Sequence, residues 1–321
     1  MKEPCGGAAC SEKFKTMIGG QALIEGILMR GPDKQAIVVR SPEGLVEKVE
    51  ELHLIKERFP ILGWPLIRGV VNFFDSMIRG VSALMYSADF FPDDGQNPAA
   101  ESKFDKWLEA HVKEETMQKL IVPFGVVLGL AFSIGLFILL PALLMEFLAG
   151  IIPSYFVRNL LEGVLRIGIF IAYLAAVSRM KDMQRVFSYH GAEHKTIRCY
   201  ESGQPLTVEN VRGMSRFHPR CGTSFLFVVM LISILVFTVV RVTKPLLRVV
   251  CKLLLLPVIV AISYEINRWV GRHDNSFTRV LTAPGLWFQK LTTSEPDDSM
   301  IEVGIRSLEL VLPEEKGKDQ W

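Results

Sequence analysis

Long apolar stretches alternate with charged segments along this chain, and their lengths separate membrane-spanning parts from soluble ones. Four stretches are long and apolar enough to predict transmembrane helices, at about 120–145, 159–178, 222–240 and 246–266. The first contains no charged residue, whereas Glu162 and Arg166 interrupt the second. These two residues are four apart with the acid first, so they can pair on the helix surface.

The polar and apolar pattern before the first span predicts a small β-meander within residues 18–50. Two short strands, at 36–40 and 45–49, flank a turn that contains Pro42 and Gly44. Residues 61–91 are rich in aromatics and leucine but broken by charges, which predicts amphipathic helices on the membrane surface.

The pattern after the fourth span predicts a helical tail. A turn at 295–298 stops the preceding segment, and a helix follows whose apolar face holds Ile301, Ile305, Leu308 and Leu312. The predicted fold is a mainly α-helical integral membrane protein with about four transmembrane helices, a small N-terminal β-meander and cytosolic helices. Its predicted parts are a disordered tail at 1–16, a cytosolic part at 17–115, a membrane domain at 116–270 and a cytosolic C-terminal helical tail at 271–321.

Composition and charge narrow the class of partner. Half of the 321 residues are hydrophobic and the formal net charge is only +2, which makes the lipid bilayer the expected environment. Basic residues do not form a stripe interleaved with aromatics, so nucleic acid is not expected as a partner. Residues 1–15 contain no apolar core, which predicts no cleavable signal peptide and a cytosolic N-terminus.

The distribution of basic residues predicts the orientation of a multi-pass protein of the cell membrane. The loop at 179–221 is rich in them, whereas the loop after the first span has only Arg158. The loop at 179–221 and both termini are therefore expected in the cytosol. Against this stand three basic residues between the third and fourth spans, Arg241, Lys244 and Arg248.

The five cysteines do not predict a disulfide framework, because their number is odd and most fall in segments placed in the cytosol. Cys5 and Cys10 are expected to be ordinary thiols in the tail. Cys251 is expected to be a small apolar residue of the fourth span.

The segment from His190 to His194 carries the strongest chemical signal. If residues 183–197 are helical, His190 and His194 lie on one face, where two imidazoles can bind one metal ion. Glu193 lies beside them and can take a proton from a bound water. This order resembles the His-x-x-Glu-His helix of the reversed zinc proteases.

His218 and Cys221 form a second pair of candidate ligands, in a tight turn that enters the third span. Nitrogen and thiolate ligands suit zinc, although iron, cobalt and nickel stay open. Three protein ligands and a water predict a catalytic site, and all four side chains together predict a closed structural site. In the alternative interpretation, these histidines are hydrogen-bonded core residues.

Three further polar residues are candidates for site-lining roles. Glu265 ends the fourth span, so it either reaches the metal site as a catalytic carboxylate or pairs with Arg268 or Arg272 at the headgroup boundary. Gln21 and Glu25 lie four apart in a Gly-rich apolar stretch. They either line the site or are solvated turn residues.

Several motifs in one order resemble the bacterial YqhQ-like family, from about residue 17 to 312. They are residues 19–26 with 29–32, 189–195, 218–223, 263–265 and 283–287 with Gln289, Thr292 and Thr293. The resemblance implies a multi-pass membrane protein of unassigned biochemical role, from a group described as metal-dependent enzymes. It implies no substrate.

Three function classes fit these features. The first is a membrane metal-dependent hydrolase in which His190, His194 and either His218 or Cys221 hold the ion and Glu193 activates water. The second is a scaffold or regulatory protein in which the same ligands form a structural zinc clip. The third is a small transporter, suggested by Glu265 and by the pair in the second span. The sequence leaves open whether the chain has membrane protein partners or forms a homo-oligomer.

Overall fold

A computed structural model describes residues 14–52, 59–91, 114–239, 242, 245–315 and 317–320 of the chain. These residues form two compact units. Unit 1 comprises residues 1–90, 171–236 and 255–321, and unit 2 comprises residues 91–170 and 237–254. The predicted tail at 1–16 lies largely outside the described residues, as do Cys5, Cys10, Arg241 and Lys244.

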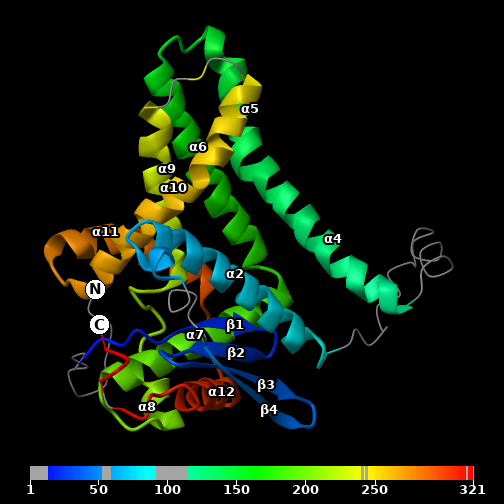
Figure 1. The fold of residues 1–321 in the computed structure, drawn as a ribbon, viewed down its shortest axis with the longest axis vertical. Helices are drawn as coiled ribbons and strands as arrows, with labels where there is room; N and C mark the ends of the chain where they lie inside the picture. The colour runs from blue at the N-terminus through cyan, green and yellow to red at the C-terminus, as the bar shows by residue number, and fades with distance from the viewer. Residues whose placement is uncertain are drawn as a thin grey trace. The chain divides into compact units, whose positions relative to one another are not determined.

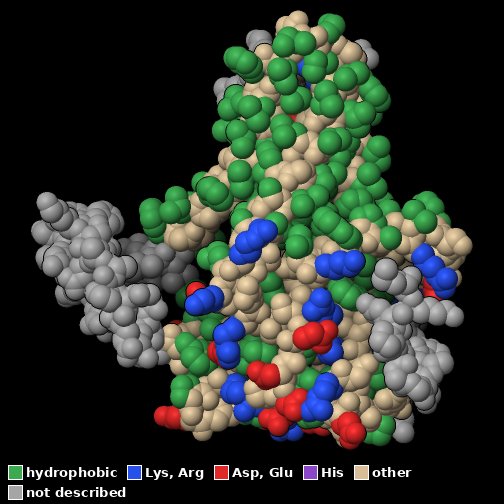
Figure 2. Space-filling view, turned by 180° about the vertical axis from the view of Figure 1, so that it is seen from behind, with side chains coloured by type: hydrophobic (Ala, Val, Ile, Leu, Met, Phe, Trp, Pro, Cys, Tyr) green, Lys and Arg blue, Asp and Glu red, His purple; other side chains and the backbone are tan. Residues whose placement is uncertain are grey.

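The described residues include four helical stretches long and apolar enough to cross a bilayer, which confirms the predicted number and associates the chain with a membrane. They are Phe124–Gly150, Tyr155–Val177, Gly222–Val239 and Val249–Arg272. The first extends five residues and the fourth six residues beyond the predicted end, because apolar residues such as Phe147, Leu148, Trp269 and Val270 recur after the first charged residue. On the face drawn in Figure 2, hydrophobic side chains cover these helices, while most charged side chains gather over the part that carries the sheet.

Unit 2 contains a long irregular helix that makes the first span. It runs through α4 (Glu114–Ile134), the π-helical turn η2 (Gly135–Leu139), α5 (Leu140–Phe147) and the short 3-10 turn η3 (Leu148–Gly150) (Figure 1). Pro141 has no N–H group, so it leaves the carbonyl of Phe137, four residues earlier, without its helical donor. Arg166 of α6 (Tyr155–Val177) donates its Nε to that carbonyl at 2.8 Å. A side chain from the next span thus satisfies a polar group inside the apolar layer.

Charged groups in unit 2 are buried together rather than exposed to lipid. Glu162, which is 2% exposed, accepts hydrogen bonds from Arg166 at 3.0 Å and from Lys252 of α10 (Pro245–Arg272). The predicted pairing of Glu162 with Arg166 is confirmed, and Lys252 is a further partner. Both cations also lie over the ring of Phe237, each at 5.4 Å from its centroid. Pairing of this kind reduces the large cost of ionised groups within a membrane.

Unit 1 contains the predicted β-meander. Its strands β1 (Gly19–Leu23), β2 (Gly26–Arg30), β3 (Lys34–Ser41) and β4 (Gly44–Glu51) pair antiparallel in chain order. The β3–β4 turn falls at the predicted Pro42-containing segment, where Gly44 adopts a φ of +136° that favours glycine. In the β1–β2 turn, Glu25 has a φ of +49°.

Helices cover both faces of this sheet, as Figure 1 shows. On one face, α7 (Lys181–Glu201) and α12 (Asp298–Glu309) bury Ile27, Met29 and Val38 in the main hydrophobic core. Helix α8 (Val208–Arg212) packs beside α7 and α12. Alternate side chains of the strands point the other way, towards α2 (Ile67–Ala88).

Helix α2 follows the short turn η1 (Pro60–Gly63) and is amphipathic, as predicted for residues 61–91. Its apolar residues Phe74, Met77, Ile78 and Val81 are exposed. Its start is joined to the end of the fourth span, because Arg68 donates its Nε to Glu265 at 2.7 Å and Asn72 donates to the hydroxyl of Tyr264 at 2.8 Å. Unit 1 also contains the end of α6 from residue 171, the part of α9 (Gly222–Val239) up to residue 236, the part of α10 from residue 255, and α11 (Ser276–Thr292).

The interaction between Arg166 and Phe137 predicts a stability effect in unit 2. An Arg166→Leu substitution removes the donor that compensates Pro141 and one of the cations that neutralise Glu162. We expect a loss of about 3 kcal/mol in the free energy of unfolding, the order found when a buried pair loses one partner. Denaturant titration of detergent-solubilised protein measures this value. The matched control is Arg179→Leu at an exposed position, where a change within about 0.5 kcal/mol is expected; equal losses in both variants would contradict the assignment.

Candidate metal centre

Helix α7 carries two of the predicted ligands, and it extends beyond the predicted 183–197 at both ends. His190 and His194 are one turn apart, and their ring centroids are 4.3 Å from each other. The half of the helix that carries them is the buried half, since Gly191 to Ile197 are all buried between the sheet and α12. Tyr189, Ala192 and Ile197 of this half pack into the main core, and the two imidazoles lie beside them.

The structure brings Cys221 to these two histidines from a distant part of the sequence. One ligand atom from each of His190, His194 and Cys221 lies within 4.8 Å of the other two. The Nε2 of His190 is 3.2 Å from the Sγ of Cys221. Cys221 lies directly before α9, so the beginning of the third span determines its position.

Main-chain carbonyls orient both imidazole rings. His190 donates its Nδ1–H to the carbonyl of Thr292 at 2.8 Å, and His194 donates its Nδ1–H to the carbonyl of Arg216 at 2.6 Å. A carbonyl can only accept, so the proton of each ring lies on Nδ1, and the Nε2 of the neutral ring carries the lone pair. Metal-binding histidines are commonly held in this way by a second hydrogen bond.

The donor set fits a transition metal ion. The Nε2 of His194 is buried without a hydrogen-bond partner among the described residues, an expensive arrangement unless that atom binds something else. Two imidazole nitrogens and one sulfur are the ligands that zinc takes readily, with one tetrahedral position left over. Within the described part of the chain, no fourth side chain completes a closed group with these three.

The electrostatics of the triad favour the ligand form of Cys221. Burial raises the pKa of its thiol, but the neighbouring His194 and His190 outweigh burial and hold that pKa well below its ordinary value. Burial correspondingly lowers the pKa of His190, yet the charge and hydrogen bond of Cys221 raise it to about 9. These shifts favour a Cys221 thiolate paired with a protonated His190 when no metal is bound. A metal ion would replace the Nε2 proton of His190, and the thiolate is the form of cysteine that binds metals.

Glu193 adjoins the triad from the same helix. Its Oε1 accepts a hydrogen bond from the main-chain N–H of Gly20 at 3.0 Å. Burial raises the pKa of this carboxyl, and the nearby His194 and His190 lower it to a smaller extent. Gly20 lies exposed on the edge strand β1, and a Cβ there would come within 3.0 Å of the Glu193 side chain. A carboxyl with a raised pKa is suited to proton transfer near neutral pH.

His218, the remaining predicted ligand, lies beside the triad rather than within it. Its ring centroid is 5.6 Å from that of His194, but its Nε2 faces the buried carboxylate of Glu201 at 3.4 Å. Arg220 also binds Glu201. Burial lowers the pKa of His218 to about 4, so its ring is neutral. The candidate ligand set is therefore three residues, with His218 as a neighbour.

Glu265, Gln21 and Glu25 lie outside the triad. Glu265 pairs with Arg68 of α2, a partner that neither interpretation of the sequence considered. The side chain of Gln21 packs against Gly80 of α2. Glu25 binds Arg185 of α7 and accepts a hydrogen bond from the hydroxyl of Tyr189 at 3.2 Å. All three join α2 or α7 to neighbouring elements, so their contacts are structural.

The residues that position the candidate ligands could not be recognised from the sequence. Gln289 is fully buried and bonds the main chain of His218 twice, accepting from its N–H at 2.8 Å and donating to its carbonyl at 2.7 Å. Gly191 allows the carbonyl of Ser294 to contact α7 where a Cβ would lie. Gln289 belongs to the motif at 283–293 and Gly191 to the motif at 189–195, but neither motif indicates what these residues contact, because all three contacts are to main-chain atoms.

Comparison with known proteins finds the same family that the sequence motifs resemble. Residues 64–314 match the family described as "Protein of unknown function (DUF1385)". The chain is 32% identical over 306 residues to "Uncharacterized protein YqhQ" of Bacillus subtilis (strain 168), covering 94% of this chain and 93% of that relative. No solved structure matches the chain.

Proposed function

The chain belongs to the DUF1385 family of proteins of unknown function, and we propose that it is a membrane-embedded hydrolase with a transition-metal centre. His190, His194 and Cys221 would hold the ion, and zinc is the metal that this ligand set favours. The observation that carries the proposal is the pair of carbonyl-oriented imidazoles, each with a ring nitrogen within 4.8 Å of the sulfur of Cys221.

The number of ligands favours catalysis over a purely structural role. Structural zinc sites are closed by four protein ligands, whereas catalytic sites keep three and leave a position for water or substrate. The triad offers three, and Glu193 lies beside them with a raised pKa. Two of the three candidate ligands, His190 and Cys221, are only half-buried.

The roles of the residues follow from their positions. When bound, the ion would polarise the carbonyl or phosphoryl group of a substrate and increase the acidity of water. Glu193 would accept the proton of the attacking water and return it to the leaving group as the scissile bond breaks. Gly20 would hold the carboxylate through its N–H, and Thr292 and Arg216 would keep the two imidazoles in the required tautomer.

A structural zinc clip is the second candidate, and one observation favours it. The groups around the triad come from α7, from the loop at 216–221 and from the end of α11, so an ion there would tie three segments together. In that case the binding energy of the metal would appear as folding energy. The transporter alternative has no such support, since Glu265 and Glu162 both form ion pairs inside the protein.

We further propose that the triad, both termini and the loop at 179–221 face the cytosol of the cell. The positive-inside rule supports this orientation, because that loop is richer in Lys and Arg than the loop after the first span.

Metal content tests the centre itself. Full-length protein purified in detergent and incubated with zinc should retain about one ion per chain after desalting. A His190→Ala/His194→Ala variant should retain almost none, because a single thiolate binds zinc weakly. Elemental analysis measures both proteins, and a His273→Ala variant, altered at an exposed histidine, is the matched control and should retain the wild-type amount. Equal and near-zero metal in wild type and double variant would refute the centre.

A Glu193→Gln substitution separates the enzyme from the clip. The amide removes the proton acceptor without removing a ligand, so zinc content should be unchanged. Hydrolysis of a panel of chromogenic carboxyl and phosphate esters by the zinc-loaded protein should fall by about 10²–10⁴-fold. Hydrolysis that persists in Glu193→Gln would rule out this carboxylate as the base, and a zinc-loaded wild type with no activity on the panel would favour the clip.

Labelling of introduced cysteines tests the orientation. Ser154 and Glu209 are exposed, one between the first two spans and the other in α8. In intact cells, a membrane-impermeant maleimide should label Ser154→Cys but not Glu209→Cys, and lysis should make both reactive. The native Cys199 is unsuitable as a reporter because it is fully buried. Labelling of position 209 in intact cells would reverse the orientation.

A further inference from the structure

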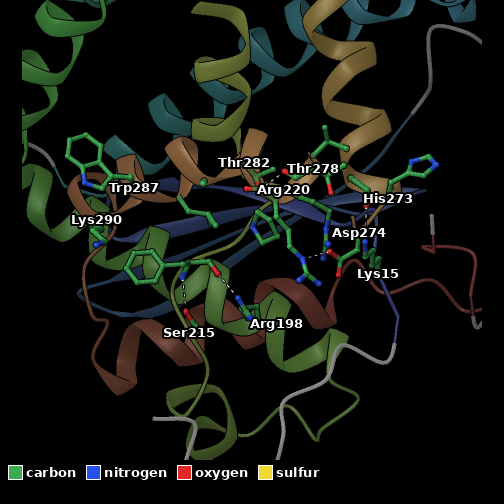
Figure 3. Close-up of a pocket in the computed structure, with 17 residues that line it drawn as sticks. Lys15, Arg198, Ser215, Arg220, His273, Asp274, Thr278, Thr282, Trp287 and Lys290 are labelled. Carbon is green, nitrogen blue, oxygen red and sulfur yellow. Dashed lines mark hydrogen bonds and ion pairs between the residues drawn. The ribbon is translucent and has the colours of Figure 1, made fainter. Parts of the chain in front are cut away.

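A pocket of about 680 Å³ lies in unit 1, and the proposed chemistry does not use it. The end of α10, the helix α11, the loop at 215–220 and Lys15 form its walls. Figure 3 shows Trp287 and Lys290 on one side, Lys15 and Asp274 on the other, and Arg198 and Arg220 between them. The volume is within the usual range for small-molecule sites.

The lining of this pocket is strongly basic. Five cationic side chains and one carboxylate line it, namely Lys15, Arg198, Arg220, Arg279, Lys290 and Asp274. Asp274 pairs with Arg279 at 2.9 Å, and Arg220 pairs with the buried Glu201. Two of the five cations are thus neutralised within the protein.

The other three cations keep their charge uncompensated. Arg198 donates to the carbonyl of Phe217 at 2.7 Å, and Lys15 donates to the carbonyl of Gly271 at 3.5 Å. These neutral acceptors fix the side chains without balancing their charge. Lys290 is exposed, and among the described residues none of the three has an ion-pair partner. The pocket thus carries an excess of about three positive charges, which favours an anion.

The pocket lies at the end of the fourth candidate span. Val270, Gly271 and His273 of its lining lie at the end of the fourth span. Helix α11 begins four residues after that span and exposes Phe277, Val280 and Trp287, at 65%, 73% and 47%. Their spacing of three and seven places them along one side of the helix. An exposed apolar side flanked by Arg279 and Lys290 is typical of a helix that lies in the membrane interface.

We propose that this pocket binds the phosphate-bearing headgroup of an anionic phospholipid. Lys15, Arg198 and Lys290 bind the phosphate oxygens, and the apolar side of α11 lies among the acyl chains next to it. Basic pockets at the ends of transmembrane helices recognise anionic headgroups by the same chemistry. This site is separate from the metal triad and does not depend on the proposed hydrolase activity.

The test compares lipid retention by full-length protein and two variants. Delipidated protein in detergent is mixed with phosphatidylglycerol or phosphatidylcholine, and bound lipid is counted by native mass spectrometry. The test variant is Lys15→Gln/Lys290→Gln, which changes side chains that contribute little to the stability of the fold. The matched control is Arg179→Gln/Lys181→Gln, two exposed basic residues beside the end of the second span and outside the pocket.

Wild type and control should retain phosphatidylglycerol in preference to phosphatidylcholine, and the test variant should bind phosphatidylglycerol about tenfold more weakly. Inorganic phosphate at millimolar concentration should not displace the lipid, and zinc content should be the same in all three proteins. Equal retention by the test variant, or equal retention of the two lipids by wild type, would overturn the proposal. Displacement by inorganic phosphate would overturn it too, since the site would then be one for free phosphate.

Discussion

Close approach of main chains around α7 is the constraint on which the rest of unit 1 depends. Three glycines permit it. At Gly191 the carbonyl of Ser294 occupies the space of a side chain, at Gly304 a Cβ would be 2.6 Å from the hydroxyl of Thr196, and Gly20 lies against Glu193. Any larger residue at these positions would separate α7 from the segment after α11, from α12 or from β1. The carbonyl that orients His190 belongs to Thr292, two residues before Ser294. The close contact of Ser294 with Gly191 therefore also determines where the acceptor of His190 lies.

Polar groups within the spans are likewise paired with other groups of the protein. Within unit 2, a proline frees a carbonyl and an arginine from the neighbouring span satisfies it, while Glu162 balances the charge of that arginine. Asn159 similarly donates to the carbonyl of Phe237 near the end of α9, at 2.8 Å. Each of these polar side chains would be costly in lipid on its own, and together they join α6 to the first span, to α9 and to α10. Glu162 and Arg166, which interrupt the second span, therefore connect neighbouring helices.

The sequence predicted the elements better than it predicted their contacts. Apolar length identified the four spans, and alternation with a Pro-Gly turn identified the meander. Spacing placed His190 and His194 on one helical turn, and Cys221 was one of two further candidate ligands, the one that the structure brings close to both histidines. His218 was grouped with them because it is close in the chain to Cys221, but Glu201 binds its ring. Glu265 was expected to reach the metal or to pair with Arg268 or Arg272, and Arg68, almost two hundred residues away, binds it instead. Ion-pair partners and carbonyl acceptors depend on long-range packing, and no residue type or spacing encodes them locally.

The two candidate sites share their supporting segments. The loop from Arg216 to Cys221 gives a carbonyl and a thiolate to the triad, and Phe217 and Arg220 of the same loop line the basic pocket. Helix α11 likewise gives the carbonyl of Thr292 to His190 and places Lys290 in the pocket. Gln289 connects the helix to the loop through both main-chain groups of His218. A ligand that shifts α11 must therefore also shift the acceptor that fixes the tautomer of His190.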